Sequence, residues 1–299
     1  VPPVLFALAL ALLLVSLSRP HVSRMLLKER ATVILVMDTS RSMQARDVQP
    51  TRLAAAQEAV RTFLDQVPGK LRVGLVVFAG EAQVATPPTR DHDLVRTSVD
   101  QIDSFLIFGG TAIGDALQAA VELGRRVTNE QRARGQEISF EPSRPQATRS
   151  LAQAPVGCDD EGPVSILFLS DGSQTRGILQ PLEGAALARE ACIPVFTIAL
   201  GTPEGVIERG SFGFGPPGQG ELIPVPPDPE TLRAIAELTG GEFSEARTAE
   251  ALESAYENLG SRLGREPGES EVTFLLVAVA AGLLVLAGVL GAALAPRLP

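Results

Sequence analysis

Five side chains with oxygen donors lie on three short motifs of this chain, each at the end of an apolar run or after a glycine pair. They are Asp38, Ser40, Ser42, Thr111 and Asp171. Hard divalent cations such as Mg²⁺, and also Mn²⁺ or Ca²⁺, prefer oxygen ligands of this kind. No histidine or cysteine lies beside these motifs, which argues against a zinc site. The residue types therefore predict a hard-cation site, provided that the fold brings the three motifs together.

The segments around these motifs predict how they are positioned. Residues 31–37 form a continuous apolar run, which is typical of a strand buried on both faces, and residues 164–170 form another. Further strands are expected at 71–78, 83–86, 195–200 and 242–244, and helices at 50–67, 91–102, 111–127, 182–191, 228–239 and 248–263. This alternation predicts an α/β fold with a doubly wound, mostly parallel sheet. Such folds bind ligands at the carboxyl ends of their strands, where Asp38 and Asp171 both fall.

The three motifs together resemble the von Willebrand factor A domain. The resemblance rests on Asp38-Thr39-Ser40-Arg41-Ser42, then Gly109-Gly110-Thr111, then a strand ending in Ser170-Asp171-Gly172, and it runs from about residue 32 to 264. It implies a Rossmann-like domain with a metal-ion-dependent adhesion site. Ser40, Ser42 and Thr111 would offer hydroxyls to Mg²⁺, and Asp38 and Asp171 would bind directly or through water. The alternative is purely local: the hydroxyls cap helices and Asp171 lies in a turn.

Within that family the chain is similar to bacterial membrane-anchored proteins of the aerotolerance-operon (Bat) type. The segment LLLVSLSRP near the start, VPPDPETLRAIAELTGG at 225–241 and an apolar segment at the end carry this resemblance. It implies a role in assembly or stress tolerance, with a MoxR-type AAA ATPase and other von Willebrand factor A membrane proteins as partners. Members of this group often have two helices before the domain, whereas this chain shows one apolar segment there.

Both ends of the chain are apolar and uncharged. Residues 272–295 would form a helix roughly 36 Å long, enough to cross a hydrocarbon core of about 30 Å. Residues 1–18 are expected to form a second membrane helix or a secretory signal anchor. The von Willebrand factor A domain, residues 31–264, would lie between the two membrane helices.

Two observations bear on the side of the membrane, and they disagree. Arg19, Arg24, Lys28 and Arg30 follow the first apolar segment, and only Arg297 follows the last. Positive charge favours the cytoplasmic side, so this asymmetry places the soluble domain in the cytoplasm. Cys158 and Cys192 each precede a predicted strand, and neighbouring parallel strands would place both near the same edge of the sheet. A disulfide between them would indicate an oxidising exterior, and two unrelated thiols are the alternative.

Three segments interrupt the regular pattern. Residues 129–163 are polar and lack periodicity, so we expect a long, disordered insertion. Residues 204–227 are rich in glycine and proline and should form a hairpin or a flap, with Phe212 and Phe214 as core anchors or as a contact patch. Residues 264–271 are expected to be a polar linker.

The overall composition argues against two classes of function, nucleic-acid binding and catalysis. The net charge is −9, and no basic stripe is interleaved with aromatic residues, so nucleic acid is not an expected partner. An enzyme is not expected either, because Ser40 stands where a second carboxylate of a phosphoryl-transfer motif would be, and because His21 and His92 are the only histidines. The preferred hypothesis is a membrane-anchored, metal-dependent module that binds an acidic residue of a protein partner. A channel-associated subunit and, last, a metal-dependent enzyme are the alternatives.

Overall fold

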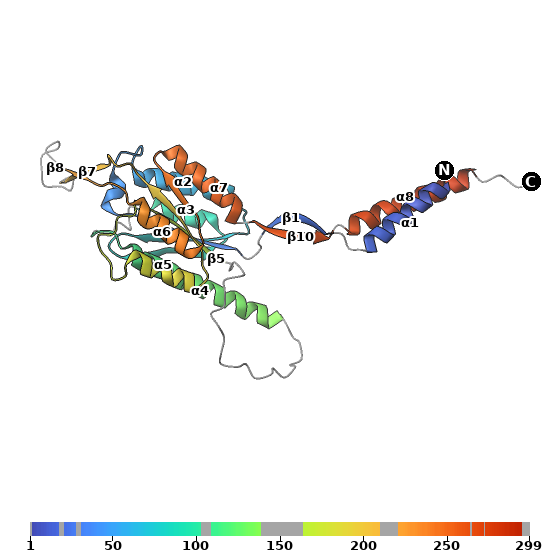
Figure 1. Ribbon diagram of the computed structural model, residues 1–299, viewed down its shortest axis with the longest axis horizontal. Helices are drawn as coiled ribbons and strands as arrows, with labels where there is room; N and C mark the ends of the chain where they lie inside the picture. The colour runs from blue at the N-terminus through green and yellow to red at the C-terminus, as the bar shows by residue number, and fades with distance from the viewer. Residues whose placement is uncertain are drawn as a thin grey trace, which may run out of the picture. The chain divides into compact units, whose positions relative to one another are not determined.

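The structure, a computed structural model, describes residues 2–17, 21–27, 31–102, 109–138, 164–209, 221–263, 265–271 and 273–294. These belong to two units (Figure 1). One unit contains residues 28–264, and the other combines the two ends of the chain, residues 1–27 and 265–299.

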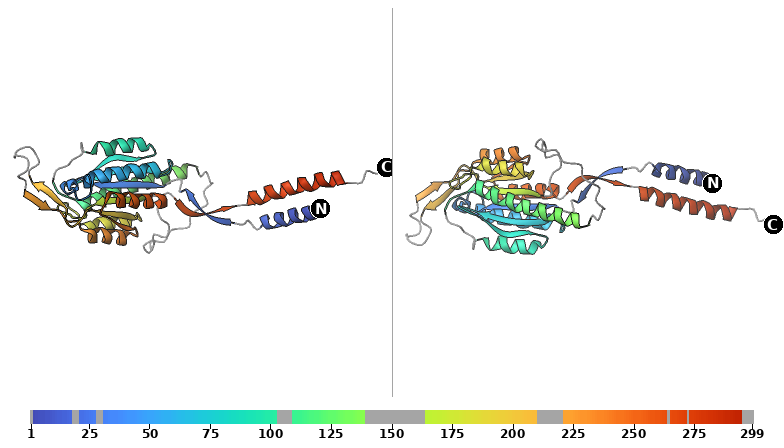
Figure 2. Two further views of the ribbon diagram at one scale, coloured as in Figure 1. Left: turned by 90° about the horizontal axis from the view of Figure 1, so that it is seen from above. Right: turned by 90° about the horizontal axis from the view of Figure 1, so that it is seen from below.

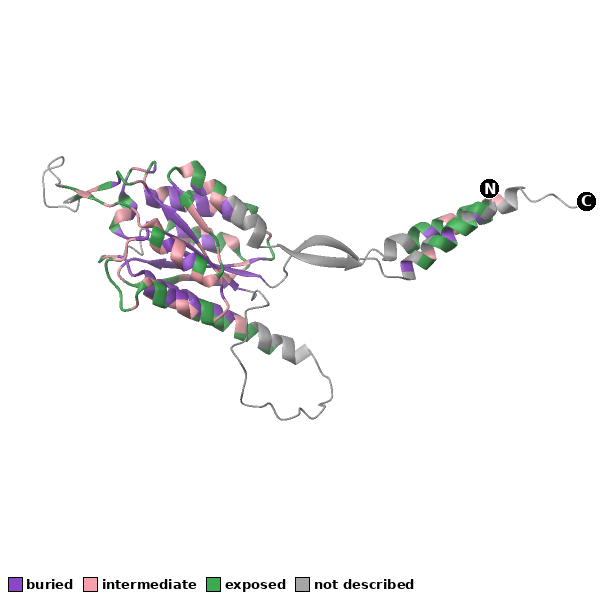
Figure 3. Cartoon of the chain, in the orientation of Figure 1, coloured by how far each residue is buried: buried purple, intermediate pink, exposed green. Residues whose placement is uncertain are grey.

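A six-stranded sheet runs through the described part of the larger unit. In spatial order its strands are β4 (Ala82–Thr89), β3 (Arg72–Phe78), β2 (Thr32–Asp38), β5 (Val164–Ser170), β6 (Val195–Leu200) and β9 (Phe243–Ala246). All neighbouring strands are parallel except β3 and β4, so the expected mostly parallel α/β sheet is confirmed. The four inner strands are almost wholly buried (Figure 3), which explains why they appear in the sequence as apolar runs.

Helices cover both faces of this sheet (Figure 2). Side chains alternate across a strand, so Val33 and Leu35 of β2 enter one core and Ile34 and Val36 enter the other. The helices α2 (Arg52–Gln66), α3 (His92–Asp100) and α7 (Ala249–Leu263) contribute to the first core. The helices α4 (Ile113–Ile138), α5 (Pro181–Glu190) and α6 (Pro229–Thr239) contribute to the second.

Local signals fix the ends of several elements. Thr51 accepts a hydrogen bond from the backbone N–H of Ala54 at the start of α2. Asp228 does the same for Thr231 at the start of α6, and Gly240 ends that helix in the left-handed conformation. The strand β4 is longer than expected and includes Pro87 and Pro88. An edge strand tolerates them because its outer N–H groups need no partner in the sheet.

The expected insertion at 129–163 is wrong in its first part. The helix α4 continues to Ile138, so residues 129–138 are helical. Their sequence contains good helix formers such as arginine, glutamine and glutamate but little apolar periodicity, so the helix could not be recognised from its hydrophobic pattern. Residues 139–163, which include Cys158, lie outside the described residues. Cys192, which follows α5, is disulfide-bonded, and Cys158 is the only other cysteine of the chain.

The glycine- and proline-rich segment forms a hairpin, which is one of the two structures predicted for it. The strands β7 (Val206–Arg209) and β8 (Glu221–Pro224) pair antiparallel. Phe212 and Phe214 lie outside the described residues.

The two chain ends form a unit of their own. The helix α1 (Pro2–Leu17) lies against α8 (Thr273–Leu294), and β1 (His21–Leu27) pairs antiparallel with β10 (Arg265–Glu271). The expected polar linker at 264–271 is thus largely a strand, which forms because the chain brings β1 alongside it. Across the described ranges, no helix has both the length and the apolar character needed to cross a membrane. The membrane helices predicted at 1–18 and 272–295 are therefore not confirmed.

Candidate functional site

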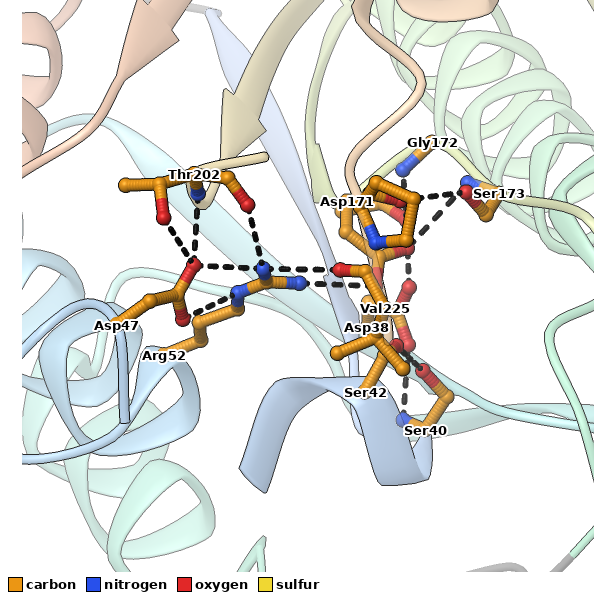
Figure 4. A network of polar contacts seen from close by, with 12 residues as sticks. Asp38, Ser40, Ser42, Asp47, Arg52, Asp171, Gly172, Ser173, Thr202 and Val225 are labelled. Carbon is orange, nitrogen blue, oxygen red and sulfur yellow. Dashed lines mark hydrogen bonds and ion pairs between the residues drawn. The ribbon is translucent and has the colours of Figure 1, made fainter. Parts of the chain in front are cut away.

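Two carboxylates lie next to each other at the carboxyl edge of the sheet. Asp38 is the last residue of β2, and Asp171 directly follows β5. These strands are parallel neighbours, and Met37 of β2 pairs with Leu169 of β5. The register therefore brings both carboxylates to one place, as the sequence predicts. Figure 4 shows them with Ser40 and Ser42 close by.

Asp38 is fully buried and has a partner for each carboxylate oxygen. Oδ1 accepts the backbone N–H of Ser40 at 2.8 Å, and Oδ2 accepts the hydroxyl of Ser170 at 2.5 Å. Burial, followed by the charge of Asp171, raises the pKa of Asp38 to about 7. A carboxylate offers roughly four acceptor sites, so two hydrogen bonds leave Asp38 with capacity for a further ligand.

Ser40 and Ser42 lie at the start of the short 3₁₀ helix η1 (Arg41–Gln44). Ser40 occupies the N-cap position, yet its side chain makes no capping hydrogen bond. Its hydroxyl instead pairs with the hydroxyl of Ser42 at 2.9 Å (Figure 4). The local alternative, in which these serines serve as helix caps, is therefore not what the geometry shows for Ser40.

A hydrogen bond between Ser42 of the first motif and Asp171 of the third connects the two motifs. Burial raises the pKa of Asp171, while a hydrogen bond from the Ser42 side chain opposes that rise. Its Oδ1 accepts the backbone N–H of Ser173 at 3.3 Å. Two like charges thus lie next to each other where water is largely excluded, because Asp38 and Asp171 are 0% and 1% exposed.

Thr111 lies on a loop held against the same edge of the sheet. The N–H of Ala112 donates to Ala79, just after β3, and the N–H of Thr111 donates to the hydroxyl of Thr175. Gly110 has a φ of 103°, and a Cβ there would lie 2.8 Å from the Thr175 hydroxyl, so glycine is required before Thr111. Within the described residues no hydrogen bond links the Thr111 hydroxyl to the other four predicted ligands.

Sequence reasoning missed a buried arginine beside the site. Arg52 of α2 is fully buried and pairs with Asp47 at 2.7 Å and with Asp171 at 3.3 Å. Burial raises the pKa of Asp47, but hydrogen bonds from Arg52 and from Thr202 outweigh it, so the pKa is lowered overall. Figure 4 shows the Arg52 guanidinium between the two carboxylates. Among the described residues, Arg52 thus places a cation beside Asp171, and no ion pair is formed by Asp38.

No signal in the sequence identifies Arg52, because arginine on an amphipathic helix is normally solvated. Its burial depends on Gly201 and Gly205, where a Cβ would clash with guanidinium atoms. Ser170 was also missed as a site residue. It directly precedes Asp171, and its hydroxyl both donates to Asp38 and accepts the N–H of Gly172 at 3.1 Å.

The donor set suits a hard cation better than a soft one. Among the described residues, no group of three or more histidine, cysteine, aspartate or glutamate side chains gathers to hold a metal. The predicted site instead offers two carboxylates and three hydroxyls. Neutral hydroxyls with few charged ligands fit Mg²⁺, which keeps part of its water shell, and do not fit the nitrogen- and sulfur-rich sites of zinc.

Comparison with known proteins agrees with this architecture. The family model of the von Willebrand factor type A domain matches residues 33–138 of this chain. A UPF0353 protein from Nocardia farcinica is 33% identical over 310 residues, which cover 100% of this chain and 82% of that protein.

Solved structures show the same fold. The conserved hypothetical protein BatB from Bacteroides thetaiotaomicron superposes with a TM-score of 0.55 at 25% identity, over 78% of this chain and 98% of that one. An aerotolerance-related membrane protein from Bacteroides fragilis superposes with a TM-score of 0.53 at 24% identity, over 78% and 99% of the two chains. This chain therefore belongs to the UPF0353 family, contains a von Willebrand factor type A domain and is similar to solved proteins of the Bat type.

Proposed function

We propose that the chain is a metal-dependent protein-binding module held at a membrane. One observation carries the proposal. Two buried carboxylates from adjacent strand ends, Asp38 and Asp171, lie beside two hydroxyls that hydrogen-bond to each other and not to a helix end. Such a group of hard donors is costly to bury without a counter-charge, and a divalent cation supplies one.

In this proposal Ser40, Ser42 and Thr111 contribute neutral oxygens, while Asp38 and Asp171 contribute negative charge directly or through water. Ser170 and the Ser40 N–H orient Asp38, and Arg52 orients Asp171. Arg52 also offsets the charge of Asp171, which keeps the site less negative than two free carboxylates would make it. A bound Mg²⁺, or Mn²⁺ or Ca²⁺ in its place, supplies an electrophile for an acidic side chain of a partner.

Binding is proposed over catalysis because both carboxylates are taken as ligands of the ion, which leaves neither of them free to act as a general base. His92 is the first residue of α3, and its ring contacts the carbonyl of Leu71 at 2.9 Å. Leu71 directly precedes β3, so His92 lies at the edge of the sheet opposite the carboxyl ends of the strands. A channel-associated subunit has no specific support from the described elements.

The membrane part of the proposal rests on the uncharged segments at the two chain ends and on the description of the Bacteroides fragilis neighbour as a membrane protein. The Bat resemblance supports a role in assembly or stress tolerance, with a MoxR-type AAA ATPase or other von Willebrand factor A membrane proteins as partners. The cytoplasmic side is proposed from the positive charges that follow the first apolar segment.

Calorimetric titration of the full chain with Mg²⁺ tests the proposed site. Asp38→Ala should abolish Mg²⁺ binding, and Thr111→Ala should weaken it about tenfold, because one neutral ligand is lost. Asp93→Ala is the matched control, since it removes a carboxylate that is 90% exposed on α3. Circular dichroism checks that each variant is folded. Unchanged Mg²⁺ binding by Asp38→Ala would rule out the site.

A further inference from the structure

A groove of about 420 Å³ lies between η1, which carries the proposed ligand Ser42, and the β7–β8 hairpin. Arg41, Gln44 and Arg46 line it from η1 and the loop that follows, and Val206, Glu208 and Leu222 line it from the hairpin. We call it the arginine groove. Arg41 lies between the proposed ligands Ser40 and Ser42 in the sequence, so the same short segment contributes residues to the groove and to the proposed ion site.

The two arginines of the groove are available to a ligand. Both are exposed, and neither forms an ion pair with a carboxylate among the described residues. By contrast Arg61, Arg96, Arg233 and Arg247 are all paired with carboxylates on the surface. Two guanidinium groups that form no ion pair with a described carboxylate create a local positive field in this groove, on a chain whose net charge is −9.

The hairpin supplies an apolar side to the groove. Val206 is 41% exposed and Leu222 is 60% exposed, although both are large hydrophobic residues. Glu208 pairs with Leu222 across the hairpin and lies further along β7, away from the stem. The groove is therefore positive near η1 and apolar at Val206 and Leu222, and its lining also includes the carboxylate of Glu208, which lies opposite Leu222.

Hydrogen bonds tie the hairpin stem to the ion site. The carbonyl of Val225 accepts from Arg52 at 3.0 Å, and the same guanidinium contacts Asp171. The N–H of Asp228 donates to the carbonyl of Asp171 at 2.6 Å. The segment that follows the hairpin and the proposed ligand Asp171 thus share the guanidinium of Arg52 as a partner.

We infer that the arginine groove is a second contact region for the partner, and that it selects an acidic protein segment with an apolar side chain next to its acidic residues. This inference rests on the proposed function, in which one carboxylate of that segment reaches the ion. A further carboxylate would then meet Arg41 and Arg46, and the apolar side chain would cover Val206 and Leu222. Because the whole chain is acidic, these two arginines and the ion are what make an acidic segment acceptable at this surface.

Two short fluorescent peptides with a central aspartate test the inference on the full chain in detergent. One peptide carries glutamate and leucine beside the aspartate, and the other carries glutamine and serine. In Mg²⁺ the first peptide should bind about tenfold more tightly, which two accessible ion pairs and one apolar contact can supply. Arg41→Gln/Arg46→Gln should remove this preference. Arg125→Gln/Arg126→Gln, on the exposed side of α4, is the matched control and should retain it.

The outcomes separate the two proposals. Equal preference in the wild type and in Arg41→Gln/Arg46→Gln overturns the groove, and so does a wild type that binds neither peptide or both equally. Chelation with EDTA should release both peptides. A preference that depends on the arginines and survives EDTA supports the groove and contradicts the metal-dependent function. Calorimetry with Mg²⁺ on the arginine variant shows whether its ion site is intact.

Discussion

Asp38 and Asp171 hold negative charge where water is excluded, and this is the feature that distinguishes the site from the rest of the molecule. Their partners are hydroxyls, backbone N–H groups and one arginine. Such an arrangement costs stability when no cation is bound, because desolvation and like charge both disfavour the ionised pair. At the residue scale, the proposed ion binding and the stability of the ion-free protein are therefore opposed.

Asp38→Asn should stabilise the ion-free protein near pH 8 by about 2 kcal/mol. Folding raises the pKa of Asp38 from 3.8 to about 7. A group of this kind contributes stability that is complete below its unfolded pKa and is lost as the pH rises through its folded pKa. The advantage of the variant should therefore shrink near about pH 5, where Asp38 is largely protonated. Urea unfolding in EDTA at the two pH values measures this, and a variant less stable than wild type at the higher pH would contradict it.

Arg52→Ala should lower the free energy of unfolding by about 3–5 kcal/mol, because it leaves the buried Asp171 and the half-buried Asp47 without their cation. Arg61→Ala is the control. Its guanidinium is 36% exposed and pairs with exposed carboxylates, so its loss should cost less than about 1 kcal/mol. Chemical denaturation of both variants gives the comparison. Similar values for the two would mean that the buried network contributes little.

Some residues of the site could be predicted from the sequence, and others could not. Asp38, Ser40, Ser42 and Asp171 follow recognisable apolar runs, so their convergence follows from strand order alone. Arg52 could not be found in this way. Its burial depends on glycines that are distant in the sequence, at 201 and 205, and no periodic pattern encodes that proximity.

At the scale of elements, the helices α4 and α5 pack closely against each other, next to the loops that carry the site. A Cβ at Gly184 of α5 would lie 2.7 Å from the Gly114 carbonyl of α4 and 2.9 Å from Leu117. The same helices carry loops of the site, since Thr111 precedes α4 and Asp115 of α4 accepts N–H groups of Ile178 and Leu179. Their separation sets where the second and third motifs lie.

Gly184→Ala should therefore destabilise the fold by about 1–2 kcal/mol, because a backbone carbonyl must move to admit the methyl group. Gly69→Ala provides the reference, since a Cβ there meets nothing within 4 Å. That variant should be neutral or more stable by up to about 1 kcal/mol, through the loss of unfolded-state entropy. Thermal unfolding of the pair isolates the contact. Equal midpoints would show that the helices adjust without cost.

Element prediction succeeded where burial imposes a pattern and failed where pairing depends on distant segments. The inner strands were found because both of their faces are buried. The pairing of β1 with β10 was missed because residues 265–271 contain proline, glycine and four charged residues, which do not resemble a strand. The end of α4 was missed because its polar turns have no apolar face.

At the scale of the whole molecule, the proposed membrane anchoring depends on the apolar segments at the two ends of the chain. The full chain should stay in the pellet when membranes are washed with alkaline carbonate, and detergent should release it. Val279→Arg/Val285→Arg places two charges in α8, each costing about 2.5–3.5 kcal/mol at a membrane centre, and should raise the carbonate-soluble fraction. Complete release of the wild type by carbonate would contradict membrane anchoring.

The central claim is that one divalent cation binds between Asp38 and Asp171. The most direct test is anomalous diffraction from crystals of the full chain soaked with Mn²⁺. We expect one peak bounded by the oxygens of Asp38, Ser40, Ser42, Thr111 and Asp171, and no peak there in Asp38→Ala. Crystals in which these side chains are ordered but the space between them holds no Mn²⁺, or in which Mn²⁺ binds elsewhere instead, would contradict the account.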